Sequence, residues 1–210
     1  MTEMEWFSGH DRGAMLDQMV GKWSKRQLRL FASACCRRVW PLIVSDAARR
    51  VVELTELCAD GLATELDLQA AASFAEANTF SLDTSTARAN TAAESLATVD
   101  NYSGPCMLVA QCAEFAAESE EGERIAQAGL LRDIFGNPFR PAAIDPAWLT
   151  STVVALAEGI YQDRAFERLP ILADALQDAG CENADILDHC RGPGPHVRGC
   201  LVVDLVLGKV

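Results

Sequence analysis

Residues 24–44, SKRQLRLFASACCRRVWPLIV, carry the clearest helical signal in the chain. Ser24 and Gln27 have the spacing of a capping box, in which a hydroxyl and an amide satisfy the first N–H groups of a helix. At about 100° per residue, this helix has an apolar and a polar face. The apolar face holds Leu28, Phe31, Ala32, Cys35, Val39, Leu42 and Ile43, and the polar face holds Arg26, Arg29, Ser33 and Arg37. Because Pro41 lacks a backbone N–H, we expect the helix to kink or end in its last turn.

Helical spacing recurs through the rest of the chain. Ser45 and Thr64 are placed to cap two further helices. Residues 78–104 contain few large apolar side chains, so they form either a thinly anchored helix near residues 86–99 or a mobile connection. The run Leu201–Val203 is the one plausible strand candidate. The sequence therefore predicts an all-α fold.

The segment Gly136-Asn137-Pro138-Phe139-Arg140-Pro141 interrupts the helical pattern. Residues before a proline avoid the α-helical region, so we expect this segment to be extended. It divides the chain into an N-terminal helical bundle, residues 1–136, and a C-terminal helical unit, residues 137–210, unless the two form one continuous domain. Two prolines and three glycines in residues 191–199 exclude regular structure from a loop in the C-terminal unit.

Charge is distributed unevenly along the chain, which has a formal net charge of −12. Residues 1–50 hold nine Lys or Arg and five Asp or Glu, a balance of +4, and residues 51–210 hold nine and twenty-five, a balance of −16. Strong net acidity argues against a nucleic-acid partner, because affinity for phosphate comes mainly from Lys and Arg. Two interpretations of the basic region stay open. Either a basic helical pair packs on the acidic remainder, or an anion-facing patch forms from Lys25, Arg26, Arg29, Arg37 and Arg38.

No targeting signal is evident in the sequence. No run approaches the roughly 18 apolar residues of a membrane span, and the acidic start Met1–Glu5 lacks the pattern of a secretory signal. We therefore expect a cytoplasmic protein without a membrane partner. In that compartment, the eight cysteines are expected to be reduced and to pack as small buried hydrophobes.

One stretch of the chain concentrates residues that can bind metal. The whole chain has eleven Cys and His residues. Four of them fall within twelve positions, namely His189, Cys190, His196 and Cys200. Thiolate and imidazole are the ligands that zinc selects, so we predict a zinc site on Cys190, His196 and Cys200, with Cys36 or Cys181 as a fourth ligand. The alternative is that the two cysteines pack in the core and His196 bonds a loop carbonyl.

Acidic residues also cluster before one predicted helix. Glu118, Glu120, Glu121 and Glu123 lie around Gly122. Acidic side chains near a helix N-terminus stabilise the helix through its dipole. We therefore interpret this cluster as a solvated turn rather than as a metal site.

Recognisable catalytic motifs are missing from the sequence. It contains no phosphate-binding loop, paired-histidine metalloprotease helix, nucleophile elbow or dinucleotide fingerprint, so we predict no catalytic or cofactor-binding residue. A cysteine-dependent enzyme is the remaining catalytic alternative. It would use Cys36 or Cys190, activated by His196 and by neighbouring arginines that lower the pKa of the thiol.

Three phrases of the sequence are distinctive: LRLFASACCRRVW (residues 28–40), LRDIFGNPF (residues 131–139) and HCRGPGPHVRGC (residues 189–200). Together they resemble an uncharacterised family of short proteins that occurs in many copies in planctomycete genomes. The resemblance spans most of the chain. It implies a family identity and no activity.

These observations favour a non-enzymatic interaction or regulatory module. The absence of catalytic motifs argues against an enzyme, and the unequal charge of the two regions favours a protein partner with a charged surface. A zinc-stabilised helical protein and a cysteine-dependent enzyme are the alternatives.

Overall fold

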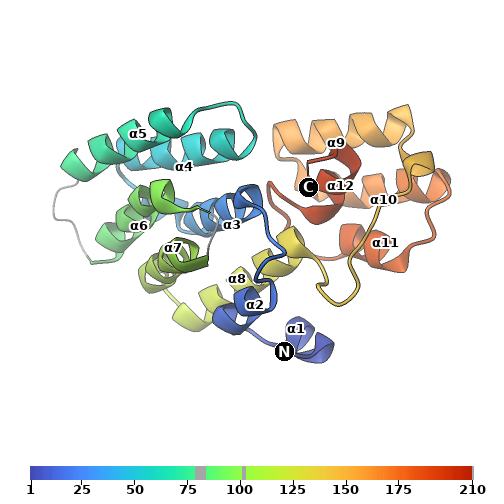
Figure 1. Cartoon of the computed structure of the whole chain (residues 1–210), viewed down its shortest axis with the longest axis horizontal. Helices are drawn as coiled ribbons and strands as arrows, with labels where there is room; N and C mark the ends of the chain where they lie inside the picture. The colour runs from blue at the N-terminus through green and yellow to red at the C-terminus, as the bar shows by residue number, and fades with distance from the viewer. Residues whose placement is uncertain (79–83, 101–102, 210) are drawn as a thin grey trace. The chain divides into compact units, whose positions relative to one another are not determined.

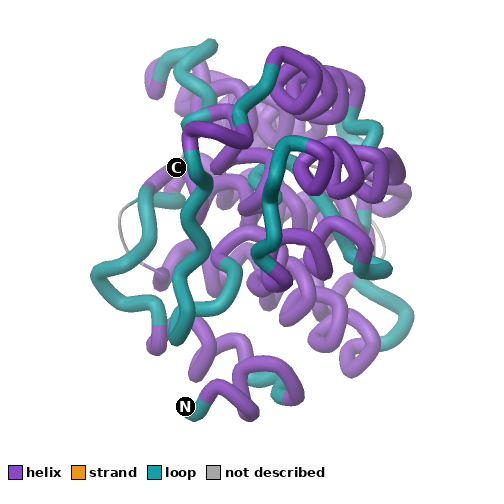
Figure 2. Tube along the Cα trace, turned by 90° about the vertical axis from the view of Figure 1, so that its right-hand side faces the viewer, coloured by secondary structure: helices purple, strands orange, loops and turns teal. Residues whose placement is uncertain are grey.

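The computed structural model describes residues 1–78, 84–100 and 103–209, and every regular element within these ranges is a helix. The predicted all-α fold is therefore confirmed. The α-helices are α1 (Glu3–Ser8), α2 (Arg12–Gln18), α3 (Lys25–Arg38), α4 (Asp46–Ala59), α5 (Glu65–Asn78), α6 (Thr84–Glu94), α7 (Ser103–Ala116), α8 (Glu120–Phe135), α9 (Ser151–Asp163), α10 (Leu169–Asp178), α11 (Ala184–Arg191) and α12 (Leu201–Leu207) (Figure 1). Short 3₁₀ helices form at Trp40–Leu42, Ser95–Thr98, Pro146–Trp148 and Phe166–Arg168. Figure 2 shows the loops that join these helices.

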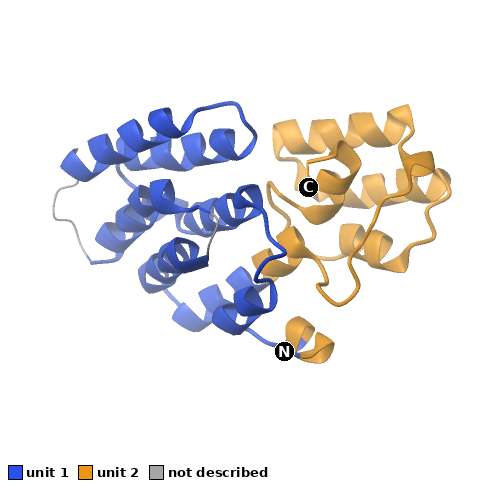
Figure 3. Ribbon diagram, viewed as in Figure 1, with its two compact units in different colours: residues 1, 8–128 blue, residues 2–7, 129–210 orange. Residues whose placement is uncertain are grey.

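The chain forms two compact units, which Figure 3 distinguishes by colour. Unit 1 comprises Met1 and Ser8–Ala128, and unit 2 comprises Thr2–Phe7 and residues 129–210. Helix α8 contributes its first part to unit 1 and its last part to unit 2. The sequence predicted a division after residue 136, whereas the contacts group the end of α8 and most of α1 with the C-terminal helices.

Helix α3 is enclosed by the other helices of unit 1. It packs against α4 and α7, and every residue from Leu28 to Cys36 is buried. Part of its polar face is buried as well, because Arg29 and Ser33 are only 3% and 1% exposed. The Arg29 guanidinium is accommodated by Glu65, whose two oxygens accept from Nη1 and Nη2 at 2.8 and 2.5 Å.

The ends of the first helices follow from the predicted caps. Ser24 and Gln27 form a complete capping box, and the Ser45 side chain accepts from the N–H of Ala48. Thr64 and Asp67 exchange hydrogen bonds in the same way at the start of α5. Helix α3 ends at Arg38 rather than near Val44, because Pro41 starts a separate 3₁₀ turn.

Residues 84–98 form α6 and a 3₁₀ turn, as the helical alternative for this region predicted. Helix α6 packs closely against α7. Ala89, Ala92 and Ala93 of this helix are completely buried, so small side chains let it pack closely against its neighbours. The rest of the ambiguous region, residues 79–83 and 101–102, lies outside the described residues.

Unit 2 has its own hydrophobic core, built where α9, α10, α11 and α12 meet. The core includes Val153, Ala157, Ile160, Leu169, Leu172, Leu176, Ile186, Val202, Val203 and Val206. The strand candidate Leu201–Val203 is wrong, because this run begins α12. Helical spacing places Val202, Val203 and Val206 on the buried side of that helix.

The loop after α11 is irregular, as its glycines and prolines predicted, and it packs on the last part of α8. Pro195 lies so close to Gly129 that a Cβ atom at residue 129 would come within 2.8 Å of the proline Cδ. Gly194 has a φ of 77°, a value that favours glycine. The loop therefore depends on a glycine in α8 and on a glycine of its own.

A helix that crosses a membrane needs about 18 or more predominantly apolar residues, and this requirement applies to each of the described helices. None of them combines enough residues with enough apolar character to cross a bilayer.

Candidate metal centre

The basic residues of the N-terminal region are paired with acidic residues inside unit 1. The pairs are Lys25 with Glu65 and Asp100, Arg26 with Asp60, Arg29 with Glu65, Arg37 with Glu56, and Arg38 with Glu123. The predicted anion-facing patch is therefore wrong, because carboxylates of the chain already meet each of these cations. The basic segment instead packs on acidic helices, as the other interpretation predicted.

The same pairing corrects the interpretation of the acidic cluster before α8. Glu123 is only 5% exposed, and both of its carboxylate oxygens accept from Nε of Arg38, at 3.0 and 2.9 Å. Glu118, Glu120 and Glu121 are exposed, as a solvated turn requires. Glu123 is a buried partner of an arginine.

Unit 2 contains a group of four metal-ligand residues: Asp133, His189, His196 and Cys200. One donor atom of each residue lies within 4.8 Å of the donor atoms of all the others. Carboxylate oxygen, imidazole nitrogen and thiolate sulfur are all ligands of zinc.

Two of the four residues lie in helices, and the other two lie in the connection between α11 and α12. Asp133 lies one turn after Gly129 on α8, and His189 lies near the end of α11. His196 is in the loop that packs on Gly129, and Cys200 caps the start of α12. The contact between Pro195 and Gly129 therefore brings His196 to the face of α8 that carries Asp133.

Asp133 is the hub of the group. Its Oδ1 lies 2.7 Å from Nδ1 of His196 and 3.1 Å from Nε2 of His189. Its Oδ2 accepts from the backbone N–H of Val197 at 3.0 Å. Nε2 of His189 in turn lies 3.2 Å from Sγ of Cys200. One carboxylate oxygen is thus fixed by the loop backbone, while the other faces the histidines.

The outer contacts match those that orient metal ligands in proteins. Nε2 of His196 points to the carbonyl oxygen of Gly192 at 3.4 Å, which leaves Nδ1 directed at the group. A ligand histidine commonly donates its second N–H to a backbone carbonyl, and a ligand carboxylate is commonly held by a further hydrogen bond. His196 and Asp133 both have such contacts.

The electrostatics of the group reflect its burial. Burial by itself would raise the pKa of Asp133, but hydrogen bonds from His189 and His196 and the charges of both rings lower it. Burial would likewise lower the pKa of His196, whereas the hydrogen bond and charge of Asp133 raise it. Burial and the charge of Asp133 raise the pKa of the Cys200 thiol well above its usual range.

The structure brings together two of the three predicted metal ligands, His196 and Cys200. Cys190 is not part of the group, and its neighbour His189 takes the place that the prediction gave to Cys190. Neither Cys36 nor Cys181, the predicted fourth ligands, belongs to it.

The fourth donor is Asp133, which the sequence prediction missed. Its signal was an acidic residue between buried apolar ones, in the run Leu131-Arg132-Asp133-Ile134-Phe135. Asp133 and His196 are 63 residues apart, so spacing along the chain could not connect them.

No protein-family model, curated protein or solved structure matches this chain. The geometry of the group therefore carries the functional argument.

Three of the four donor residues line a surface pocket of unit 2. The pocket has a volume of about 330 Å³ and is lined by Asp133, His189 and His196 together with Phe7, Arg132 and Asp188. A second pocket, of about 290 Å³, shares Phe7, Arg132, Asp188 and His189. Cys200 lines neither pocket and is completely buried. The group thus has a histidine side toward the pockets and a sulfur side toward the core.

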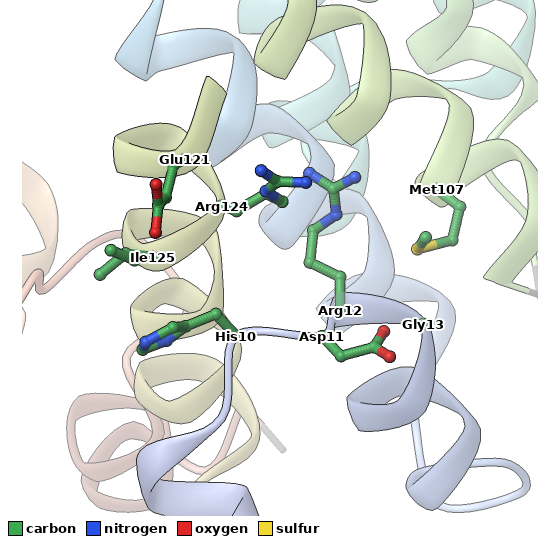
Figure 4. Close-up of a pocket in the computed structure, with 8 residues that line it drawn as sticks. All are labelled: His10, Asp11, Arg12, Gly13, Met107, Glu121, Arg124 and Ile125. Carbon is green, nitrogen blue, oxygen red and sulfur yellow. The ribbon is translucent and has the colours of Figure 1, made fainter. Parts of the chain in front are cut away.

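Unit 1 has a pocket of its own, of about 460 Å³, between the start of α2 and α8. Figure 4 shows the Arg12 and Arg124 side chains directed to the same region of this pocket. Both arginines pair with the buried Glu114, at 2.5 and 3.5 Å, and the acidic residues Asp11 and Glu121 also line the pocket. Because acidic groups offset the two cations, this pocket offers no net positive site for an anion.

The predicted cysteine nucleophiles are both inaccessible. Cys36 and Cys190 have no exposed surface. Burial raises the pKa of Cys190 to about 12 and the pKa of Cys36 further still. Thiolate is the nucleophilic form of cysteine, so these environments oppose catalysis by either residue near neutral pH.

Proposed function

We propose that this chain is a non-enzymatic helical protein whose C-terminal unit binds a zinc ion through Asp133, His189, His196 and Cys200. The single observation that carries the proposal is the convergence of these four donor atoms within 4.8 Å. The group contains the predicted ligands His196 and Cys200. Its donor set of one sulfur, two nitrogens and one oxygen suits a four-coordinate zinc ion.

The distances within the group fit a site that opens slightly to receive a metal. Zinc bonds of about 2.0–2.3 Å in tetrahedral geometry separate neighbouring donor atoms by about 3.3–3.6 Å. The contacts of His189 with Asp133 and Cys200 are 3.1 and 3.2 Å, and the contact of His196 with Asp133 is 2.7 Å. These three contacts would lengthen by about 0.2–0.6 Å around an ion. Donor atoms that lie farther apart, at up to 4.8 Å, would move closer together.

A cysteine–histidine–aspartate catalytic arrangement suits the same residues less well. In such a triad, the nucleophile contacts the ring nitrogen that takes its proton, and the carboxylate contacts the other ring nitrogen and orients the imidazole. Here Sγ of Cys200 and Oδ1 of Asp133 both approach Nε2 of His189. Convergence of both groups on one nitrogen favours a shared metal over a catalytic triad. The complete burial of Cys200 also opposes attack on a substrate.

The position of the loop between α11 and α12 favours a structural role for the ion. Metal binding stabilises a fold because the ligands are brought together only in the folded chain. An ion on these residues would tie the loop around His196 to α8, α11 and α12. We propose that this rigid surface serves interaction or regulation with a protein partner, which agrees with the lack of a recognisable catalytic motif.

The test is zinc binding by the full chain, purified without a chelator or a metal-delivering tag. We expect a single zinc ion per chain by elemental analysis, and a higher melting temperature than after chelator treatment. Cys200→Ser is expected to weaken zinc binding by a factor of 100 or so, since a ligand is lost.

Cys181→Ala is the matched control, because Cys181 is a buried cysteine of the same unit outside the group. It is expected to retain the zinc. Circular dichroism separates loss of the metal from loss of the fold. Equal zinc content in wild-type protein and a folded Cys200→Ser variant would refute the proposed site.

A further inference from the structure

We infer that the zinc ion has an exchangeable coordination position toward the pocket lined by His189, His196 and Arg132, and that it binds the carboxylate group of a small organic acid there. This inference rests on the proposed metal site and names the class of ligand that the site would take.

The first observation is the asymmetric burial of the four donor residues. The side chains of His189 and His196 are 19% and 11% exposed, whereas Cys200 has no exposed surface. The pocket is bounded by Asp133, His189 and His196 and not by Cys200. An ion among the four donors would therefore face solvent on the histidine side only. Zinc is most often four-coordinate but can expand to five ligands, so an exposed side of the ion leaves room for one further donor.

The second observation is the charge around this opening. A zinc dication, the Asp133 carboxylate and a Cys200 thiolate sum to zero, so the loaded group is neutral. Arg132 adds a positive charge to the pocket wall, and its Nε donates to the carbonyl oxygen of Trp6 at 2.8 Å, which anchors the guanidinium. Arginine pairs with carboxylates in a bidentate geometry.

Asp188 limits the charge of the ligand. It is exposed on the same pocket wall, and it lines both pockets together with Arg132. Because the zinc ion already balances the charge of Asp133, a ligand with two negative charges would meet uncompensated repulsion from Asp188. A monocarboxylate carries a single negative charge and can contact both the ion and Arg132. We therefore expect the site to bind a monocarboxylate in preference to phosphate.

The remaining walls suit the apolar part of such an acid. Phe7, Pro193 and Pro195 line the pocket, and Phe7 is 52% exposed. The volume of about 330 Å³ lies at the small end of pockets that hold small molecules. We therefore assign the pocket to a small acid rather than to a larger ligand.

The test uses the full chain loaded with cobalt(II), whose visible absorption reports coordination number, and acetate as the probe. Acetate is expected to change the spectrum in a saturable way, as a fifth ligand binds. Acetamide has the same shape without the charge and is expected to leave the spectrum unchanged.

Two variants examine the pocket wall. Arg132→Gln is expected to weaken acetate binding about tenfold, because a charge-assisted hydrogen bond is lost. Arg168→Gln, which removes an exposed arginine of the same unit outside the pocket, is expected to have no effect. Cobalt content is measured for each variant, so that loading and ligand binding are separated.

The outcomes distinguish this inference from the proposed metal site. Failure of the chain to bind cobalt or zinc overturns both. A cobalt spectrum that acetate does not change overturns the open position and leaves the metal site standing. Equal binding of acetate and acetamide, tighter binding of inorganic phosphate, or unchanged acetate binding in Arg132→Gln overturns the assignment to a carboxylate.

Discussion

The two units compensate their buried carboxylates in different ways. In unit 1, Glu56, Glu114 and Glu123 are 3–5% exposed, and each pairs with at least one arginine. In unit 2, Asp133 is equally buried at 3% and faces two histidines. Arginine carries its charge at every accessible pH, whereas histidine loses it near neutrality.

This difference separates a structural use of charge from a chemical one. An arginine stays charged and remains paired with its buried carboxylate, so the pair cannot bind a metal ion. Two histidines and a thiol leave the compensation of Asp133 dependent on protons, which a metal ion can replace. The candidate site therefore lies in unit 2, where the groups around a buried carboxylate can exchange protons for a metal ion.

The largest effect is expected where a permanent cation of unit 1 is removed. Arg12 is buried and bonds both Gln127 and Glu114. Arg12→Leu leaves an acid in the core without its closest partner, so we expect a loss of about 3–5 kcal/mol in the free energy of unfolding. Urea denaturation measures this loss.

Arg50→Ala is the control for Arg12→Leu, because the pair of Arg50 with Glu53 is exposed. Exposed pairs contribute at most about 1 kcal/mol. If both variants lost the same small amount, the buried pair would not stabilise unit 1 in the way proposed here.

A smaller effect is expected for Asp133 in metal-free protein. Asp133→Asn keeps the shape of the side chain but removes the acceptor charge for two histidines. We expect a loss of about 1–3 kcal/mol, which is the cost of leaving buried hydrogen-bonding groups poorly matched. Urea denaturation in the presence of a chelator measures it. A wild-type stability for this variant would show that the two histidines do not depend on the carboxylate.

The contribution of Asp133 should depend on pH in a defined window. The folded pKa of His196 is raised above 6.5, so its stabilisation is complete below pH 6.5 and is lost as pH rises through the folded pKa. The folded pKa of Asp133 is lowered below 3.8, so its stabilisation is present above pH 3.8 and is lost as pH falls through the folded pKa. The difference between wild type and Asp133→Asn should therefore be greatest between these limits. A difference that is constant from about pH 4 to pH 9 would contradict this coupling.

Sequence patterns predicted the helices of both units well, because local signals define them. The capping residues Ser24, Ser45 and Thr64 lie within three residues of their partners, and the proline at residue 41 acts on its own turn. The burial of part of the polar face of α3 was not predicted, for the opposite reason. Whether Arg29 faces water depends on Glu65, which lies 36 residues away.

The candidate site shows the same limit. The clustering of Cys and His near the C-terminus predicted the location of the group and two of its four donor residues. Helical geometry then decides which neighbour faces the donor group, since His189 and Cys190 differ by about 100° around α11, and Cys190 points into the core. Asp133 joins through the docking of the loop on α8, a contact that depends on the absence of a side chain at Gly129.

The docking of the loop on α8 provides a further prediction, with a smaller net effect. Gly129→Ala places a Cβ 2.8 Å from Cδ of Pro195, so the loop must move. We expect a loss of about 1–2 kcal/mol after the gain in helix propensity, together with weaker zinc binding. Gly159→Ala in α9 meets no atom within 4 Å and should stabilise the protein by about 0.5–1 kcal/mol. Urea denaturation of both variants measures the two changes in the free energy of unfolding, which should have opposite signs. A gain in stability in both variants would show that the loop does not need its contact with α8.

The smallest expected effect is that of Cys190→Ala on zinc affinity. Cys190 was a predicted ligand, yet the structure groups its neighbour His189 with Asp133, His196 and Cys200. Cys190 is completely buried in the core of unit 2. Truncation of a small buried side chain costs about 1 kcal/mol of stability. It should leave the zinc dissociation constant unchanged, because the sulfur is outside the donor group.

Competition with a chelator of known affinity measures that constant in wild type, Cys190→Ala and His189→Gln. If Cys190→Ala weakened zinc binding and His189→Gln did not, the ligand set predicted from sequence would replace the one assigned from the structure.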